Sequence, residues 1–275
     1  DALPILEYAY DDWCISVLAG ALDDEANRDK YAAFAEGYKV YFDPSTRFMR
    51  GLDSEGNWRT PFNPRASNHR NDDYCEGTAW QWTWFVPHDV DGLVELMGGR
   101  DAFIGKLDSL FTADSKLEGE STSVDISGLI GQYAHGNEPS HHIAHLYNYV
   151  GQPWRTQEIV DEVLHTLYFN NPDGLSGNED CGQMSAWYIL NAMGFYQVCP
   201  GKPVYSIGRP LFNEATVHLK DGKSFKVIAH NNSRDNKYVQ SIVLNGNKLE
   251  TPFFTHQDIV DGGTLELTMG SEPLK

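Results

Sequence analysis

The chain has few of the residues that mark redox proteins, zinc ribbons or membrane proteins. Its four cysteines, Cys14, Cys75, Cys181 and Cys199, are widely spaced, and no two of them form a Cys-x-x-Cys pair. This spacing argues against a zinc ribbon or a redox motif. Four cysteines in 275 residues do not make a disulfide framework. No apolar run approaches the roughly 20 residues of a membrane-spanning helix.

Basic residues are also scarce. Lys and Arg number 21 against 39 Asp and Glu, which gives a formal net charge of −18 at pH 7. A nucleic acid requires a basic protein surface, so this balance argues against such a partner. It suits a neutral ligand, or a hard cation held by oxygen ligands. Aromatic residues make up 12% of the chain, and although most should lie in the core, some faces could pack on sugar rings.

The sequence begins with Asp1 rather than Met, and no signal peptide precedes it. We therefore expect a chain processed or cut from a longer protein. Hydrophobic residues account for 41% of the chain, enough for a sizeable core in one large domain or two unequal ones.

The first two thirds of the chain show apolar residues at helical spacing. Only Asp23 and Asp24 separate the first two helical segments, which predicts an antiparallel helix pair. Long polar connections, at 43–74 and 112–137, alternate with the helices and are typical of a helical toroid with its active site in loops at one end. The predicted helices are 5–22, 25–42, 78–85, 89–97, 101–111, 140–150, 154–168 and 183–193.

After Gly201 the pattern changes to short, alternating, β-branched segments with turn signals at Asp221-Gly222 and Asn245-Gly246. The predicted strands are 214–219, 224–229, 241–244 and 264–269. The fold class is therefore mainly α. Residues 1–202 are predicted to form part of an (α/α)6 toroid, and residues 203–275 a small C-terminal β-sandwich portion. So few strands would need others from outside this chain.

Three loop segments contain the residues that could carry chemistry. In the first, Glu76 precedes an aromatic-rich helix. Apolar rings beside a carboxylate disfavour its charged form, as a general acid requires. The alternative, equally supported by these residues, is that Glu76 caps the helix. Asp89, further along, is favoured as an N-cap.

The second segment, HGNEPSHH at 135–142, precedes a predicted helix on which His141 and His145 would share one face. This is half of a zincin pattern and gives an alternative function, a zinc-dependent hydrolase. His142 stands where a zincin has its glutamate base, however, and no third ligand is evident. The simpler interpretation is that these histidines line a pocket or form hydrogen bonds in the core.

The third segment, PDGLSGNEDCGQMSAWY at 172–188, presents Asn178, Glu179 and Asp180 ahead of a predicted helix. The positive end of that helix would keep at least one carboxylate ionised, as a general base should be. Simple N-capping by Asp180 is the alternative. One protonated and one ionised acid on separate loops fit glycoside hydrolysis.

Taken together, these strings resemble glycoside hydrolase family 92, and the resemblance runs nearly end to end. Besides the segments at 135–142 and 172–188, it rests on EGTAWQWTWFVPHDV at 76–90, GQPWRTQ at 151–157, GFYQVCPG at 194–201, YSIGRPLF at 205–212 and Asp11-Asp12-Trp13-Cys14. It implies a calcium-dependent, inverting exo-α-mannosidase, secreted or periplasmic, that acts on mannose-containing glycans such as N-glycans. By that comparison an N-terminal β-sandwich domain and the first toroid helices lie outside this chain.

The resemblance also implies roles for individual residues. Glu76 corresponds to the general acid, Asp180 to the general base, and Glu138 to the residue that holds a sugar hydroxyl. The remaining substrate-binding candidates in these motifs are Trp80, His88, Asp89, Asn178 and Glu179.

Calcium ligands are expected at or near His141, where some family members carry Asn. Since histidine is a poor ligand for a hard cation, Asn137, Gln183 and backbone carbonyls are further candidates. A non-catalytic carbohydrate-binding fragment is a third hypothesis, because this chain could lack part of the site.

Overall fold

The computed structural model describes residues 3–68 and 72–275. The chain divides into two compact units, unit 1 (Asp1–Ser140) and unit 2 (His141–Lys275). No helix in the described ranges is both long and apolar enough to cross a membrane. None of the four cysteines forms a disulfide within the described ranges. The predicted change from toroid to sandwich after residue 202 falls within unit 2 and stays a prediction.

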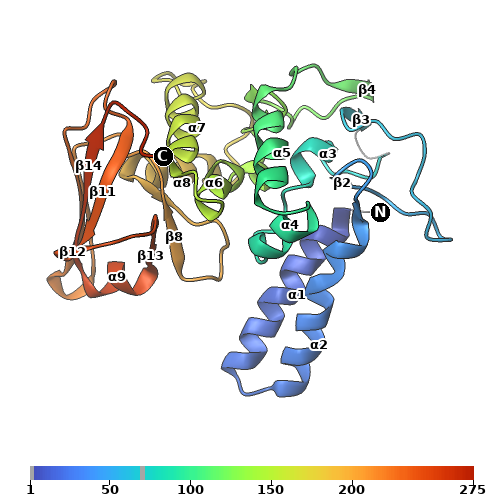
Figure 1. Ribbon diagram of the computed structural model, residues 1–275, viewed down its shortest axis with the longest axis horizontal. Coiled ribbons are helices and arrows are strands. Elements are labelled where there is room, and N and C mark those ends of the chain that lie inside the picture. The colour runs from blue at the N-terminus through green and yellow to red at the C-terminus, as the bar shows by residue number, and fades with distance from the viewer. Residues whose placement is uncertain (1–2, 69–71) are drawn as a thin grey trace. The chain divides into compact units, whose positions relative to one another are not determined.

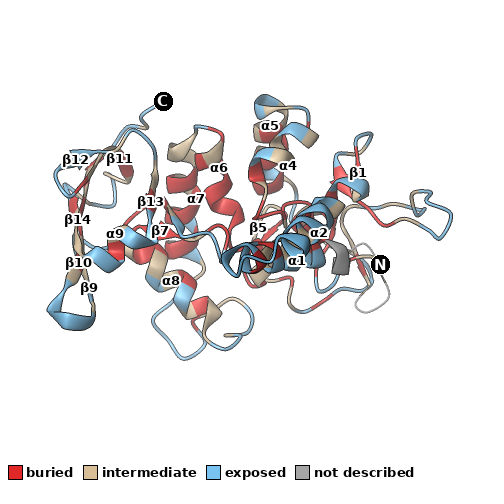
Figure 2. Cartoon of the chain, turned by 90° about the horizontal axis from the view of Figure 1, so that it is seen from below, coloured by how far each residue is buried: buried red, intermediate tan, exposed pale blue. Residues whose placement is uncertain are grey.

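Unit 1 begins with the predicted antiparallel helix pair, α1 (Leu3–Ala21) and α2 (Glu25–Ala35), which lie side by side (Figure 1). Asp24 starts α2 by accepting a hydrogen bond from the backbone of Asn27 at 3.1 Å. Much of this pair is exposed (Figure 2). Both predicted helices are confirmed, except that the second passes into the 3-10 helix η1 (Glu36–Tyr41) after Ala35.

The rest of unit 1 consists of short elements joined by long loops, as the polar segments predict. The helices are α3 (Ala79–Trp82), α4 (Val90–Leu96), α5 (Arg100–Thr112) and the 3-10 helix η2 (Glu138–Ser140). The long loops contain three strand pairs: β1 (Phe42–Asp43) with β2 (Phe48–Met49), β3 (Ala66–Asn68) with β4 (Glu118–Ser121), and β5 (Leu129–Ile130) with β6 (Tyr133–Ala134).

The helical part of unit 2 differs from the prediction at one point. Residues 140–150 do not form one helix but the short elements η3 (Ile143–His145) and α6 (Leu146–Tyr149). His141 therefore does not share a helix face with His145. The helix α7 (Pro153–Thr166) begins at the proline that predicts it, and α8 (Gln183–Met193) has the predicted bounds.

The strands of unit 2 form two sheets that enclose one apolar core. The core packs Phe195, Ile207 and Phe254 of the smaller sheet against Phe225, Leu265 and Leu267 of the larger one. In order, the smaller sheet is β13 (Phe253–Thr255), β8 (Val204–Ile207) and β7 (Phe195–Tyr196). The larger is β12 (Asn247–Lys248), β11 (Tyr238–Leu244), β14 (Gly263–Gly270), β10 (Ser224–His230) and β9 (Glu214–His218).

All four predicted strands occur in the larger sheet, whereas the smaller sheet includes β7, which precedes the predicted start of the β-sandwich portion at residue 203. Both predicted turns occur: Asp221-Gly222 lies in η4 (Lys220–Gly222) between β9 and β10, and Asn245-Gly246 joins β11 to β12. The helix α9 (His256–Asp261) leads into β14, which pairs with β10 in parallel.

Candidate active site

Glu76 lies in an exposed loop of unit 1 immediately before α3. Its carboxylate does not cap the helix, because Thr78 is the N-cap and Gln81 completes a capping box with it. The Gln81 side-chain oxygen accepts from the Thr78 backbone N–H at 2.6 Å. The capping alternative for Glu76 is therefore wrong. The Thr-x-x-Gln spacing was readable in the sequence as this capping signal.

The backbone of Glu76 is left-handed, with φ of 51°. This region is costly for a residue that has a Cβ atom, and such residues concentrate at functional sites. Two side chains hold the loop by its main chain. Asn137 Nδ2 donates to the Glu76 carbonyl at 2.8 Å, and Trp82 Nε1 donates to the Cys75 carbonyl at 2.9 Å.

Other carboxylates lie near Glu76. Burial raises the pKa of Glu7, and the charges of Asp11 and Glu76 raise it further. Burial likewise raises the pKa of the Cys75 thiol, followed by the charge of Glu76. Since a raised pKa keeps a thiol protonated, Cys75 is a weak nucleophile at neutral pH.

Trp80 packs within unit 1 near Lys106 of α5. Its ring meets Phe48 edge-on with centroids 4.9 Å apart, and Lys106 Nζ lies 4.6 Å from the Trp80 centroid. Burial lowers the pKa of Lys106 to about 7, and the charge of Arg47 adds to this effect. The half-buried indole is thus part of a packed cluster, and its contact with substrate stays a prediction.

His88 and Asp89 both have structural roles. His88 is buried, and its Nε2 lies 3.1 Å from the Ala35 carbonyl. Asp89 is the N-cap of α4, as the sequence favours: its carboxylate accepts from the Gly92 backbone at 3.0 Å and from the Tyr38 hydroxyl at 2.7 Å. Burial raises the pKa of Asp89, but these hydrogen bonds outweigh it and the pKa lies below its usual range.

In unit 2, Asp180 lies in an exposed loop just before α8. It is not the N-cap, because that position belongs to Gly182, so the capping alternative is wrong here too. The carboxylate of Asp180 has no hydrogen-bond partner in the described parts of the chain. Its φ is 49°, and Cys181 and Gly182 continue the left-handed run at 56° and 95°.

Glu179, rather than Asp180, satisfies the start of α8. Its two carboxylate oxygens accept from the backbone N–H and the hydroxyl of Ser185, both at 3.0 Å. The adjacent Asn178 is exposed. Neighbouring acids thus differ in role: Glu179 fixes the loop to the helix, and Asp180 keeps its carboxylate available.

The candidate calcium ligands differ in their fit to the ion. Gln183 Nε2 donates to His141 Nδ1 at 3.1 Å and to the Tyr196 hydroxyl at 3.2 Å. This hydrogen bond uses the lone pair with which His141 Nδ1 would bind a cation, whereas it leaves the Gln183 side-chain oxygen available. Asn137 likewise donates through nitrogen, and its oxygen is available. The amide oxygens of Asn137 and Gln183 therefore suit a hard cation, and His141 Nδ1 does not.

The zinc alternative conflicts with the environment of His145. Its Nδ1 lies 3.0 Å from the Ser206 hydroxyl and its Nε2 lies 2.8 Å from the Asn191 side-chain oxygen, so both ring nitrogens are engaged. The described residues contain no group of three or more His, Cys, Asp or Glu side chains that could hold a metal. His145 is thus a hydrogen-bonded core histidine.

An exposed acid on a loop of each unit agrees with the two carboxylates that glycoside hydrolysis requires. The model of the glycosyl hydrolase family 92 catalytic domain matches residues 4–271. The chain belongs to this family.

Solved structures and a curated relative agree. A Bacteroides thetaiotaomicron family GH92 α-mannosidase in complex with mannoimidazole is 43% identical with a TM-score of 0.92, over 98% of this chain and 36% of that one. A family GH92 inverting mannosidase from the same organism is 42% identical with a TM-score of 0.86, over 98% and 37%. An uncharacterized secreted glycosidase of Arthroderma benhamiae is 29% identical, over 97% of this chain and 35% of that protein. The chain therefore spans about a third of the length of these relatives.

Proposed function

We propose that this chain forms the catalytic part of a calcium-dependent, inverting exo-α-mannosidase that acts on mannose-containing glycans such as N-glycans. The observation that carries the proposal is that Glu76 and Asp180 have the same exposure, backbone conformation and position before a helix. Both are exposed, left-handed in backbone and free of a capping role. The family membership, and the mannosidases among similar structures, support mannose as the sugar that is released.

Each acid has one role in the proposed reaction. Glu76 donates a proton to the glycosidic oxygen, and Asp180 removes a proton from the water that attacks the anomeric carbon from the opposite face. Glu138, half-buried in η2, would hold a hydroxyl of the mannose being released. The other candidate contacts of the substrate are Trp80, His88, Asp89, Asn178 and Glu179.

Calcium would be held through side-chain amide oxygens, for which Asn137 in unit 1 and Gln183 in unit 2 are separate candidates. When bound, calcium supplies coordination to the adjacent cis hydroxyls at C2 and C3 of mannose and so favours ring distortion toward the oxocarbenium-like transition state. The (α/α)6 toroid, an N-terminal domain in the parent protein and a secreted or periplasmic location belong to the same proposal. The secreted fungal relative supports the last of these.

The test uses Glu76→Gln and Asp180→Asn, which keep the size of each side chain and remove its acid or base. Because general acid–base groups each contribute about 10²- to 10⁴-fold, kcat/KM on α-mannosides should fall by about that factor in either variant. EDTA should abolish activity and added calcium restore it. Proton NMR of the first product should show β-mannose, as inversion requires.

Retention of activity in both variants would refute the assignment of the two acids. Release of α-mannose would refute inversion. Stoichiometric zinc in the purified protein would favour the alternative hydrolase. Binding of α-mannosides without cleavage by the wild-type chain would instead favour the carbohydrate-binding fragment.

A further inference from the structure

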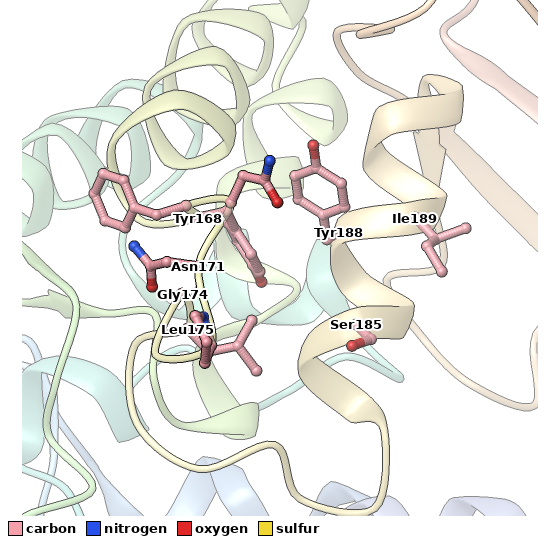
Figure 3. Close-up of a pocket in the computed structure, with 10 residues that line it drawn as sticks. Tyr168, Asn171, Gly174, Leu175, Ser185, Tyr188 and Ile189 are labelled. Atoms are coloured by element: carbon pink, nitrogen blue, oxygen red, sulfur yellow. The ribbon is translucent and has the colours of Figure 1, made fainter.

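A pocket of about 630 Å³ opens in unit 2 between the segment that follows α7 and the start of α8 (Figure 3). It is formed by residues 168–172 and 174–175, which follow α7, and by residues of the first two turns of α8. Its volume lies within the roughly 300–1,000 Å³ of small-molecule sites. Neither Glu76 nor Asp180 is among the residues that line it.

The lining combines polar and apolar side chains and carries no formal charge, since none of the residues that form it is acidic or basic. Asn171 Oδ1 accepts from the Asp173 backbone at 3.1 Å, which leaves the amide nitrogen of Asn171 for a ligand. Neither the Asn170 amide nor the Tyr188 hydroxyl has a hydrogen-bond partner in the described ranges of the chain. A charged ligand would find no opposite charge in the pocket.

Aromatic and aliphatic side chains supply the remaining surface, the aliphatic ones being Pro172, Leu175 and Ile189. The rings of Tyr168 and Tyr188 stand together with centroids 4.8 Å apart (Figure 3). Phe169 is 59% exposed although it is a large apolar residue. Exposed aromatic surface beside uncharged hydrogen-bonding groups suits a sugar ring, whose C–H face packs on aromatic rings while its hydroxyls reach the amides. A purely apolar ligand would leave those amides unpaired.

One residue that lines the pocket, Ser185, also holds the loop that contains Asp180. Ser185 lines the pocket, and its backbone N–H and hydroxyl hold the Glu179 carboxylate. Asp180 follows Glu179 directly. A ligand against Ser185 would therefore contact the residue that fixes the loop of the proposed base.

We propose that this pocket binds a neutral oligosaccharide through sugar units that are not cleaved. The inference rests on the proposed function, because it identifies these units with the remainder of a mannoside substrate. The pocket would favour longer glycans over simple mannosides, and Phe169 would be its main contact.

Two exposed phenylalanines of unit 2 provide a matched test. Phe169 lines the pocket, whereas Phe212, 51% exposed, does not. Binding of α-mannotriose and of methyl α-mannoside is measured by calorimetry for Phe169→Ala and Phe212→Ala, both in the Asp180→Asn chain so that the trisaccharide stays intact. In the chain with Asp180, kcat/KM is compared between α-mannotriose and an aryl α-mannoside.

We expect Phe169→Ala to weaken binding of the trisaccharide about five- to tenfold, the size of one lost aromatic contact. Its affinity for methyl α-mannoside, and all values for Phe212→Ala, should stay unchanged. Equal loss for both ligands, or no loss for either, would overturn the inference, as would a wild-type-like kcat/KM ratio in Phe169→Ala. If the wild-type chain cleaves no mannoside, the proposed function fails, but the difference in trisaccharide binding still decides the role of the pocket.

Discussion

The loops that contain Glu76 and Asp180 expose an acid in similar ways but are held by different means. In unit 1, Trp82 and Asn137 hold the main chain on either side of Glu76, and Asn137 lies 61 residues away in sequence. In unit 2, Glu179 holds the loop through Ser185, only six residues away.

The difference shows that an exposed carboxylate can be positioned without contacts of its own. In both loops the hydrogen bonds go to neighbouring atoms, so the acid can meet a substrate without first breaking a protein contact. The first loop depends on a tertiary core, and the second on a helix start. We therefore expect core substitutions to damage the first loop more than the second.

The two units also differ in their buried ionisable groups, His145 in unit 2 and Lys106 in unit 1. The largest effect that we expect is a loss of folding stability at low pH caused by His145. Burial lowers the pKa of His145 in unit 2 from 6.5 to about 4, although the Asn191 hydrogen bond opposes the change. In the unfolded chain this histidine binds a proton below pH 6.5, whereas in the folded chain it stays neutral down to about pH 4. Stability should therefore fall as pH drops through this window, by about 3 kcal/mol in total.

Denaturant unfolding at several pH values between 6.5 and 4 measures this loss. The variant His145→Gln lacks the titrating ring, so its unfolding free energy should vary less over the window. Lys106 in unit 1 contributes little there, since its folded pKa of about 7 and its ordinary pKa of 10.5 both lie above the window. An equally steep dependence in His145→Gln would show that another group causes it.

Gly77→Ala tests the loop of unit 1 and should have the next largest effect. A Cβ atom at Gly77 would lie 2.6 Å from Trp82 Nε1, on a ring that is 1% exposed and cannot move freely. Overpacking of this kind costs about 1–3 kcal/mol. Displacement of the ring should also weaken its hydrogen bond to the Cys75 carbonyl and reduce kcat.

Gly37→Ala is the control for this substitution, because a Cβ atom at Gly37 would meet nothing within 4 Å and the residue stands in a 3-10 helix of the same unit. The melting temperature and kcat are measured for both variants, and both quantities should be lower in Gly77→Ala than in Gly37→Ala. Equal values for the two would show that the Trp82 ring does not hold the loop of Glu76.

Much of the fold could be predicted because its signals are local. Pro153 marks the start of α7, and the bounds of α8 follow from its apolar spacing. The prediction of one helix over residues 140–150 was wrong because polar side chains of this segment make tertiary contacts that a local pattern does not reveal. His145 binds Ser206 and Asn191, and Asn148 binds Ser206 as well, so short turns replace a continuous helix.

The site divides in the same way. The sequence motifs predicted which loop segments contain candidate acids, but they did not predict which acid in each segment has a structural role. Thr78 and Glu179 settle that question through the helix starts that they satisfy. The left-handed backbone of Glu76 has no local signature, since glutamate is not a residue that favours this region.

Asn137→Asp separates anchoring from calcium binding at one residue. Aspartate keeps an oxygen for a cation but loses the N–H that Asn137 donates to the Glu76 carbonyl at 2.8 Å. We expect kcat/KM to fall about tenfold, the value of one hydrogen bond to a positioned group, with no loss of calcium affinity. Calcium titration of activity measures both quantities. Wild-type kcat/KM in this variant would show that the hydrogen bond does not position Glu76.

Glu179→Gln should have the smallest effect and gives the sharpest contrast within one loop. Glutamine can still accept one of the two hydrogen bonds from Ser185, so the loss of stability should stay near about 0.5–1 kcal/mol. Because Glu179 holds the loop and Asp180 is the proposed base, kcat/KM should fall only about threefold in Glu179→Gln, against at least about a hundredfold in Asp180→Asn. Steady-state kinetics on one α-mannoside compares the two directly. If the adjacent substitutions reduce kcat/KM equally, Glu179 takes part in the chemistry, and the separation between the residue that holds the loop and the residue that reacts does not apply in unit 2.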